Sequence, residues 1–250
     1  MIELKNVSSG YGKRQVLCDL CAEFKIGKLT SLIGVNGCGK STLLKTVIGV
    51  LPLNGGAVTV DGVDLSRLKD KERARRIAYL AQGRADPEMT VGEMVLQGRF
   101  PHTTYPRGYS AEDKRIALEA MERLRISELR DTLVSALSGG IKQKAYISMA
   151  LAQQADHILL DEPTTFLDIS HQLELMRLLR GIADSGHGVV VVMHDLPMAL
   201  SFSDEIAVMR DGRIIMKATP AEVCSSGIIK EIFGVSVSFD RTGQCYRYDL

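Results

Sequence analysis

A glycine-rich loop between an apolar run and a helical pattern constrains the fold of this chain more than any other feature. The apolar run spans residues 29–33, and the helical pattern spans residues 41–50. The loop between them reads Gly34-Val35-Asn36-Gly37-Cys38-Gly39-Lys40-Ser41 and fits the pattern GxxxxGK[ST]. Loops of this kind wrap phosphate groups with inward N–H groups, and the helix N-terminus adds partial positive charge. The sequence therefore predicts a strand–loop–helix unit that binds the phosphates of a nucleotide.

Side chains in this loop have separate expected roles. The Lys40 ammonium suits the β- and γ-phosphates, and the Ser41 hydroxyl suits Mg²⁺. Cys38 is interpreted as a small residue that fits the loop, and the electropositive surroundings are expected to lower the pKa of its thiol. Bound ATP is then expected to slow alkylation of Cys38. The predicted ATP-binding residues of this segment are Gly34, Asn36, Gly37, Cys38, Gly39, Lys40, Ser41 and Thr42.

A second apolar run ends in two acids. It reads His157-Ile158-Leu159-Leu160-Asp161-Glu162-Pro163. A strand that ends there would place Asp161 near a phosphate-bound Mg²⁺, with Glu162 one residue further on. Glu162 could then polarise a water for in-line attack on the γ-phosphorus. Together with the phosphate loop, this pair predicts nucleotide hydrolysis.

Composition limits the class of protein. The 250 residues carry a formal net charge of +1, which argues against a polybasic nucleic-acid binder. The longest uncharged stretch, residues 46–60, is shorter than the roughly 20 apolar residues that a membrane-spanning helix needs. No secretory signal is visible at the N-terminus, so we expect a cytosolic protein with reduced cysteines. Cys18 and Cys21 form a lone CxxC, which we interpret as structural.

The alternation of strand-like and helical segments predicts an α/β fold with a helical insertion. Residues 2–7 and 16–24 favour strands on either side of a turn at residues 8–12. Later strands are expected at 156–160, 188–193, 206–209 and 213–216, and helices at 111–124, 142–153, 170–183 and 197–203. The run Val189–Val192 suits a central parallel strand that is buried on both faces.

The segment Leu137-Ser138-Gly139-Gly140 narrows the class further. It lies between the phosphate loop and the Asp-Glu strand, and these motifs in this order resemble the ATP-binding cassette (ABC) family over nearly the whole chain. The resemblance implies a P-loop NTPase (RecA-like) core with an N-terminal antiparallel β subdomain and an inserted α-helical subdomain. The chain is then a single ABC ATPase domain, with residues 1–83 and 156–250 as the nucleotide-binding core and 84–155 as the helical subdomain.

Several further residues match the family pattern. Tyr11 resembles the aromatic residue that stacks on adenine, and Gln82 resembles the glutamine that senses Mg²⁺ and the membrane partner. Leu167-Asp168 resembles the D-loop, and His194 resembles the switch histidine that contacts the γ-phosphate. The resemblance thus implies a catalytic set of Lys40, Glu162 and His194 and a Mg²⁺ set of Ser41, Gln82 and Asp161. Ile141 departs from the pattern, because the family usually has Gln after LSGG.

The resemblance also implies partners. Two cassettes sandwich two ATP molecules head to tail, so that Ser138, Gly139 and Gly140 bind the γ-phosphate held by the facing chain. One loop and one LSGG segment predict a homodimer, or pairing with a similar chain. The chain would lie peripherally at the cytoplasmic face of the cell membrane. Two transmembrane permease subunits would dock there on residues 83–110, and a substrate-binding protein would act indirectly. No nucleic-acid partner is expected.

Two segments resemble the cassettes of iron-siderophore importers. The first is residues 159–172. The second is residues 97–102 followed by residues 109–113. Importers of haem or vitamin B12 are related alternatives. A soluble cassette ATPase of iron–sulfur cluster assembly is another alternative function, because it shares the catalytic motifs. A DNA-repair or chromosome ATPase is disfavoured, because it would need long heptad arms for which 250 residues leave no room. The presence of both Glu162 and His194 argues against a nucleotide-binding module that does not hydrolyse ATP. His102 and His171 lack a second ligand at metal spacing, which argues against iron binding.

Overall fold

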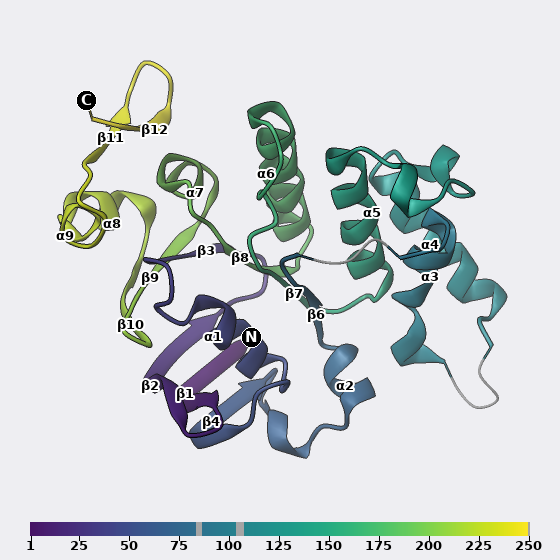
Figure 1. The fold of residues 1–250 in the computed structure, drawn as a ribbon, viewed down its shortest axis with the longest axis horizontal. Coiled ribbons are helices and arrows are strands. Elements are labelled where there is room, and N and C mark those ends of the chain that lie inside the picture. The colour runs from purple at the N-terminus through teal and green to yellow at the C-terminus, as the bar shows by residue number, and fades with distance from the viewer. Residues whose placement is uncertain (84–86, 104–107, 250) are drawn as a thin grey trace.

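The computed structural model describes residues 1–83, 87–103 and 108–249 and is built around a larger, mainly parallel sheet (Figure 1). Its strand order is β10-β9-β3-β8-β7-β6, in which β9, β3, β8, β7 and β6 run parallel and β10 pairs antiparallel with β9. The strands are β3 (Leu29–Ile33), β6 (Ile77–Leu80), β7 (His157–Leu160), β8 (Gly188–Val192), β9 (Glu205–Arg210) and β10 (Arg213–Ala218). Strands β3, β7 and β8 are buried along their whole length, which fits the continuous valine run of β8 and the mainly apolar sequences of the other two.

Different layers cover the two faces of this sheet. Helices α6 (Ile169–Asp184) and α7 (Leu196–Phe202) lie on one face, and α1 (Lys40–Val47) lies on the other (Figure 1). Beyond α1 is a smaller antiparallel sheet in the order β2-β1-β4-β5. Its strands are β1 (Ile2–Tyr11), β2 (Arg14–Phe24), β4 (Leu53–Val60) and β5 (Val63–Asp64). The two layers share one apolar cluster, in which Leu4 and Leu17 of the smaller sheet meet Val190 of the larger one.

The first strand is longer than the sequence predicted. The expected turn at residues 8–12 is wrong, because β1 continues to Tyr11. Ser9 is fully buried, donates from its hydroxyl to the Pro52 carbonyl at 2.8 Å and accepts from the Thr46 hydroxyl at 3.0 Å. A Cβ on Gly10 would lie 2.0 Å from the Arg14 carbonyl oxygen. Small and polar residues therefore serve close strand packing here, although they are typical of turns.

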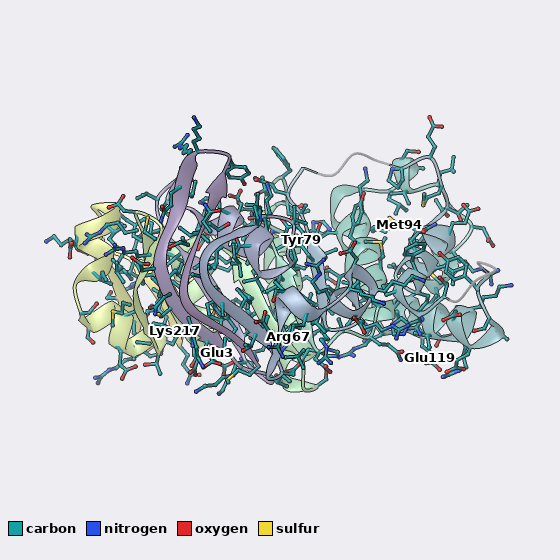
Figure 2. The ribbon with its side chains drawn as sticks, turned by 90° about the horizontal axis from the view of Figure 1, so that it is seen from below. Glu3, Arg67, Tyr79, Met94, Glu119 and Lys217 are labelled. Carbon is teal, nitrogen blue, oxygen red and sulfur yellow. The ribbon has the colours of Figure 1, made fainter. Side chains whose placement is uncertain are left out.

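A helical lobe extends from the β6 edge of the larger sheet. It contains α3 (Val91–Gln97), α4 (Ala111–Arg123) and α5 (Gly139–Ala152). Figure 2 shows Met94 and Glu119 of this lobe at the end of the molecule remote from Lys217 of β10. Arg99 and Asp113 form a buried ion pair at 3.0 Å, and Arg99 also donates to the Ala152 carbonyl at 2.7 Å. The segment that suggested siderophore importers thus ties the helices of the lobe together.

The remaining elements lie at the periphery. They are α2 (Asp70–Ala74), α8 (Pro220–Ser225), α9 (Ile228–Phe233), the hairpin β11 (Val237–Asp240) and β12 (Cys245–Tyr248), and 3₁₀ turns at Leu65–Arg67, Phe100–His102, Ser127–Leu129 and Val134–Ala136. The hairpin packs on α7, where the Tyr246 backbone N–H donates to the Ser201 hydroxyl at 3.0 Å. Within the described ranges, no helix has both the length and the apolar character that crossing a membrane requires.

Candidate active site

Neighbouring parallel strands deliver the predicted site residues to one edge of the larger sheet. The phosphate loop follows β3, His194 follows β8, Asp161 and Glu162 follow β7, and Gln82 follows β6. These four strands are adjacent in the order β3-β8-β7-β6, so their carboxyl ends meet. A cavity of about 630 Å³ opens there and is lined by Tyr11, Arg14, Val16, Asn36, Gly37, Gly39, Lys40, Ser41, Thr42, Gln82, Glu162 and His194.

The phosphate loop presents the amino end of α1 to this cavity. Gly39 is the N-terminal cap residue of the helix and has φ 108°, a backbone conformation that glycine adopts readily and other residues rarely do. The first turn of α1 carries no acidic residue, so no carboxylate within it neutralises the partial positive charge of the N–H groups. The Lys40 ammonium is nearly buried and donates to the carbonyls of Gly34 at 2.8 Å and Val35 at 3.1 Å. The loop therefore concentrates donors and positive charge in a small volume.

Gly34 and Cys38 support the loop from behind and do not line the cavity. A Cβ on Gly34 would lie 2.3 Å from the Met209 carbonyl oxygen, so this position accepts only glycine without a backbone shift. Cys38 is 5% exposed. Burial raises the pKa of its thiol, although Lys40 opposes that change. The expected lowering of the Cys38 pKa is therefore wrong, because the loss of solvation outweighs the nearby positive charge.

Ser41 and Asp161 form the polar floor of the site. The Ser41 hydroxyl donates to Asp161 Oδ1 at 3.0 Å, and the Tyr79 hydroxyl donates to Asp161 Oδ2 at 3.3 Å. Burial raises the pKa of the Asp161 carboxyl. Adjacent hydroxyl and carboxylate oxygens are the hard ligands that Mg²⁺ prefers, so this pair fits the predicted metal. Gln82, the third predicted ligand, instead donates its side-chain amide to Glu162.

The Glu162 carboxylate is held between two side chains from the neighbouring strands. Its Oε1 lies 2.6 Å from His194 Nε2, and its Oε2 accepts from Gln82 Nε2 at 2.5 Å. The backbone of Glu162 has φ 50°, which is rare for a residue with a side chain and is often found at functional sites. His194 remains 45% exposed and so can meet a ligand in the cavity. The arrangement orients a carboxylate toward the loop.

Tyr11 and two residues that the sequence analysis did not single out also line this cavity. Tyr11 ends β1 and is 47% exposed, as expected of a ring that stacks on a flat ligand. Arg14 and Val16 line the cavity beside it. The sequence could have indicated both residues, because they begin the strand that follows Tyr11 in the hairpin.

The LSGG segment lies at the start of α5, away from the phosphate-loop cavity. Ser138 is the N-terminal cap residue of α5, and its side chain makes no capping hydrogen bond. Gly139 lines a separate cavity of about 300 Å³ whose other walls include Glu162 and Phe166. Ile141, at the position where the family pattern has Gln, packs partly buried against the larger apolar core. Within one chain, the structure does not bring Ser138, Gly139 and Gly140 to the phosphate loop.

His102, His171 and Cys21, which the sequence analysis considered as possible ligands, each contact a polar group of the chain. His102 Nε2 lies 2.9 Å from the Gln153 carbonyl oxygen, and His171 Nδ1 lies 2.8 Å from Asp168. The Cys21 thiol contacts Asn6, and all five cysteines are free. Among the described residues, no group of three or more metal-binding side chains is gathered.

Comparison with known proteins agrees with this geometry. The ABC transporter family model matches residues 17–165. The ferric enterobactin transport ATP-binding protein FepC of Escherichia coli is 40% identical over 92% of this chain and 86% of its own length. The iron(3+)-hydroxamate import ATP-binding protein FhuC of Bacillus subtilis is 38% identical over 100% of this chain and 95% of its own length.

Solved structures show the same fold. An ATP-binding subunit of an ABC transporter superposes with a TM-score of 0.76 at 26% identity, covering 94% of this chain and 93% of the other. An ATP-binding cassette, seen as a post-hydrolysis dimer with ADP and Pi, superposes with a TM-score of 0.74 at 29% identity, covering 88% and 99%. The predicted cassette fold is thereby confirmed, and the chain belongs to the ABC transporter family.

Proposed function

We propose that this chain is the ATP-binding and ATP-hydrolysing subunit of an importer for iron(III)–siderophore complexes. The observation that carries the enzymatic part is the Glu162 carboxylate, held between His194 and Gln82 and facing the phosphate loop across one cavity. The names of the relatives support the cargo, since they refer to ferric enterobactin and iron(3+)-hydroxamate.

The loop would bind the triphosphate. The first N–H groups of α1 have no partner within the helix and would donate to the phosphates, and the Lys40 ammonium adds a full positive charge there. Tyr11 would stack on the adenine at the rim. Ser41 and Asp161 would hold Mg²⁺, with Gln82 as a further proposed ligand. The metal would neutralise charge on the β- and γ-phosphates.

Glu162 would act as the general base. Its carboxylate takes a proton from a water molecule while the water oxygen attacks the γ-phosphorus, and the bond to the ADP oxygen breaks. Gln82 and His194 keep the carboxylate pointing into the cavity, because each contacts a different oxygen of the same group. His194 is exposed enough to contact the γ-phosphate as well.

A second copy of the chain would complete the site. Ser138, Gly139 and Gly140 would bind the γ-phosphate held by the facing chain, so ATP would join two cassettes. Exposed apolar side chains near the D-loop support such an interface, because Phe166 is 97% exposed and Ile169 is 73% exposed. Hydrolysis would remove the shared ligand and favour the open state.

This chain would lie at the cytoplasmic face of the membrane and bind two permease subunits that span it. A substrate-binding protein would contribute indirectly. Residues 83–110 are the proposed docking surface, of which 84–86 and 104–107 lie outside the described residues. We propose that the domain divides into a nucleotide-binding core, residues 1–83 and 156–250, and a helical subdomain, residues 84–155. The separation of the two sheets from the helical lobe supports this division.

The dimer is tested with Glu162→Gln, a change that keeps the size of the side chain and removes the base. The variant should bind ATP and accumulate as an ATP-bound dimer, measured by light scattering on a sizing column. ADP is the matched control and should leave it monomeric. A variant that stays monomeric with ATP and still hydrolyses it would refute the roles proposed for Glu162 and the LSGG segment.

The cargo is tested by uptake into vesicles that contain the chain and its co-purified permease. Ferric siderophore should enter in an ATP-dependent manner, and labelled haem and vitamin B12 should not. Uptake of haem or B12 alone would reassign the importer. Absence of any co-purifying permease, with ATP hydrolysis intact, would favour a soluble cassette ATPase.

A further inference from the structure

His171, on the first turn of α6, connects two separate parts of the molecule. Its Nδ1 lies 2.8 Å from both carboxylate oxygens of Asp168, and its backbone N–H donates to Asp168 at 2.9 Å. Asp168 is also the N-terminal cap of α6. These bonds from His171 and one from Ser170 lower the pKa of the Asp168 carboxyl to about 2, so it is ionised at neutral pH. The imidazole is therefore oriented by the D-loop.

The other edge of the same ring lies against the start of α5. A Cβ on Gly140 would lie 2.3 Å from His171 Cδ2 and 2.9 Å from Nε2. Because Asp168 fixes the ring, it could not swing away without losing its hydrogen bonds. Position 140 therefore accepts only glycine while His171 keeps this orientation. The LSGG segment and the D-loop are in direct contact through one side chain.

The junction around this contact borders an open space at the surface. A solvent-open cavity of about 190 Å³ lies between the end of α4 and helices α5 and α6, and its walls include Gly140, Gln143, Leu167, His171 and Leu175. The first turn of α5 therefore has room to move on this side. One ion pair, Lys144–Glu174 at 2.7 Å, also joins α5 to α6 across this junction.

We propose that His171 is a positioning residue, which holds the LSGG segment at the distance from the D-loop that the facing ATP requires. This inference rests on the ATPase function proposed above. Without the ring, the first turn of α5 would shift into the neighbouring cavity, and Ser138 and Gly139 would move with it. The phosphate loop of the same chain would be unaffected, so ATP binding would persist while turnover in the dimer falls.

A double-mutant cycle tests the contact. Gly140→Ala should lower kcat about tenfold in the native background, because the new methyl group collides with the ring. In the His171→Ala background the same change should cost at least about threefold less than in the native background, because the ring is gone and only the effect of the methyl group beside the facing γ-phosphate remains. An equal loss in both backgrounds would overturn the proposal.

A second pair of variants separates positioning from simple support of α6. His171→Asn retains a donor for Asp168 but lacks the ring edge, so its kcat should fall as far as that of His171→Ala, with KM for ATP within about twofold of native. Native turnover in His171→Asn would overturn the proposal. Arg177→Ala, an exposed change further along α6, is the matched control and should behave as the native chain.

Hydrogen exchange distinguishes failure of this inference from failure of the proposed function. Amides of residues 142–145, the first in α5 with helical hydrogen bonds, should exchange about tenfold faster in His171→Ala without nucleotide, while α1 stays unchanged. Unchanged exchange at 142–145 would overturn the positioning role. A native chain that hydrolyses no ATP would refute the proposed function, whatever the exchange experiment shows.

Discussion

The phosphate loop and the Glu162 cluster line the same cavity but are built in opposite ways. The loop is one continuous strand–loop–helix segment, whose donors are backbone groups and Lys40. The cluster takes Gln82, Glu162 and His194 from the ends of three different strands, and it exists only because β6, β7 and β8 are neighbours. A local segment can therefore supply binding, whereas the reacting group depends on the whole sheet.

The largest difference between the two halves should appear in ATP affinity. Lys40→Ala should weaken ATP binding about 100-fold, because a charged hydrogen-bond donor is removed from the phosphates. Titration calorimetry measures this, with Lys45→Ala on the same helix as the control. An unchanged affinity would contradict the role of the loop.

The cluster should respond far more in turnover than in affinity. Gln82→Ala and His194→Ala should each lower kcat about tenfold or more, because each removes one contact that orients the Glu162 carboxylate. The dissociation constant for ATP should rise by no more than about threefold, because the phosphate loop keeps its contacts when a proposed contact to Mg²⁺ or the γ-phosphate is lost. If binding and turnover fell by the same factor, the division between a binding half and a reacting half would not hold.

Tyr11 should have a smaller effect, confined to binding. Tyr11→Ala should weaken ATP binding about fivefold through lost ring contact, and Tyr11→Phe should bind as the native chain does. A fluorescent ATP analogue reports both. A Tyr11→Phe variant as weak as Tyr11→Ala would show that the hydroxyl, and not the ring, contacts the nucleotide.

The smallest effect concerns the thiol behind the loop. Burial raises the pKa of Cys38, so at pH 7 less of it is thiolate than in a free thiol, and it should be alkylated more slowly than the exposed Cys21. ATP should slow Cys38 by a further factor of about two, by holding the loop closed. Mass spectrometry after timed labelling gives both rates, and equal Cys38 rates with and without ATP would remove the second claim.

The same contrast explains how far sequence could predict this molecule. Strand β3 and helix α1 were predicted closely because the loop and its flanks are contiguous. The placement of Glu162 between Gln82 and His194 could not be predicted from the residues alone, since it depends on strand order. Ser9 and Gly10 misled the assignment of β1, because their burial is set by Thr46, Pro52 and Arg14. The strand β6 and the hairpin β11–β12 are too short to give a clear periodic signal.

The most direct test of the account is single-turnover hydrolysis of ATP by the native chain and by Glu162→Gln, with both saturated with ATP and Mg²⁺. The account predicts at least about a 100-fold slower chemical step in Glu162→Gln, with ATP affinity within about twofold of native. Equal single-turnover rates would contradict the claim that Glu162, held by Gln82 and His194, is the group that activates water.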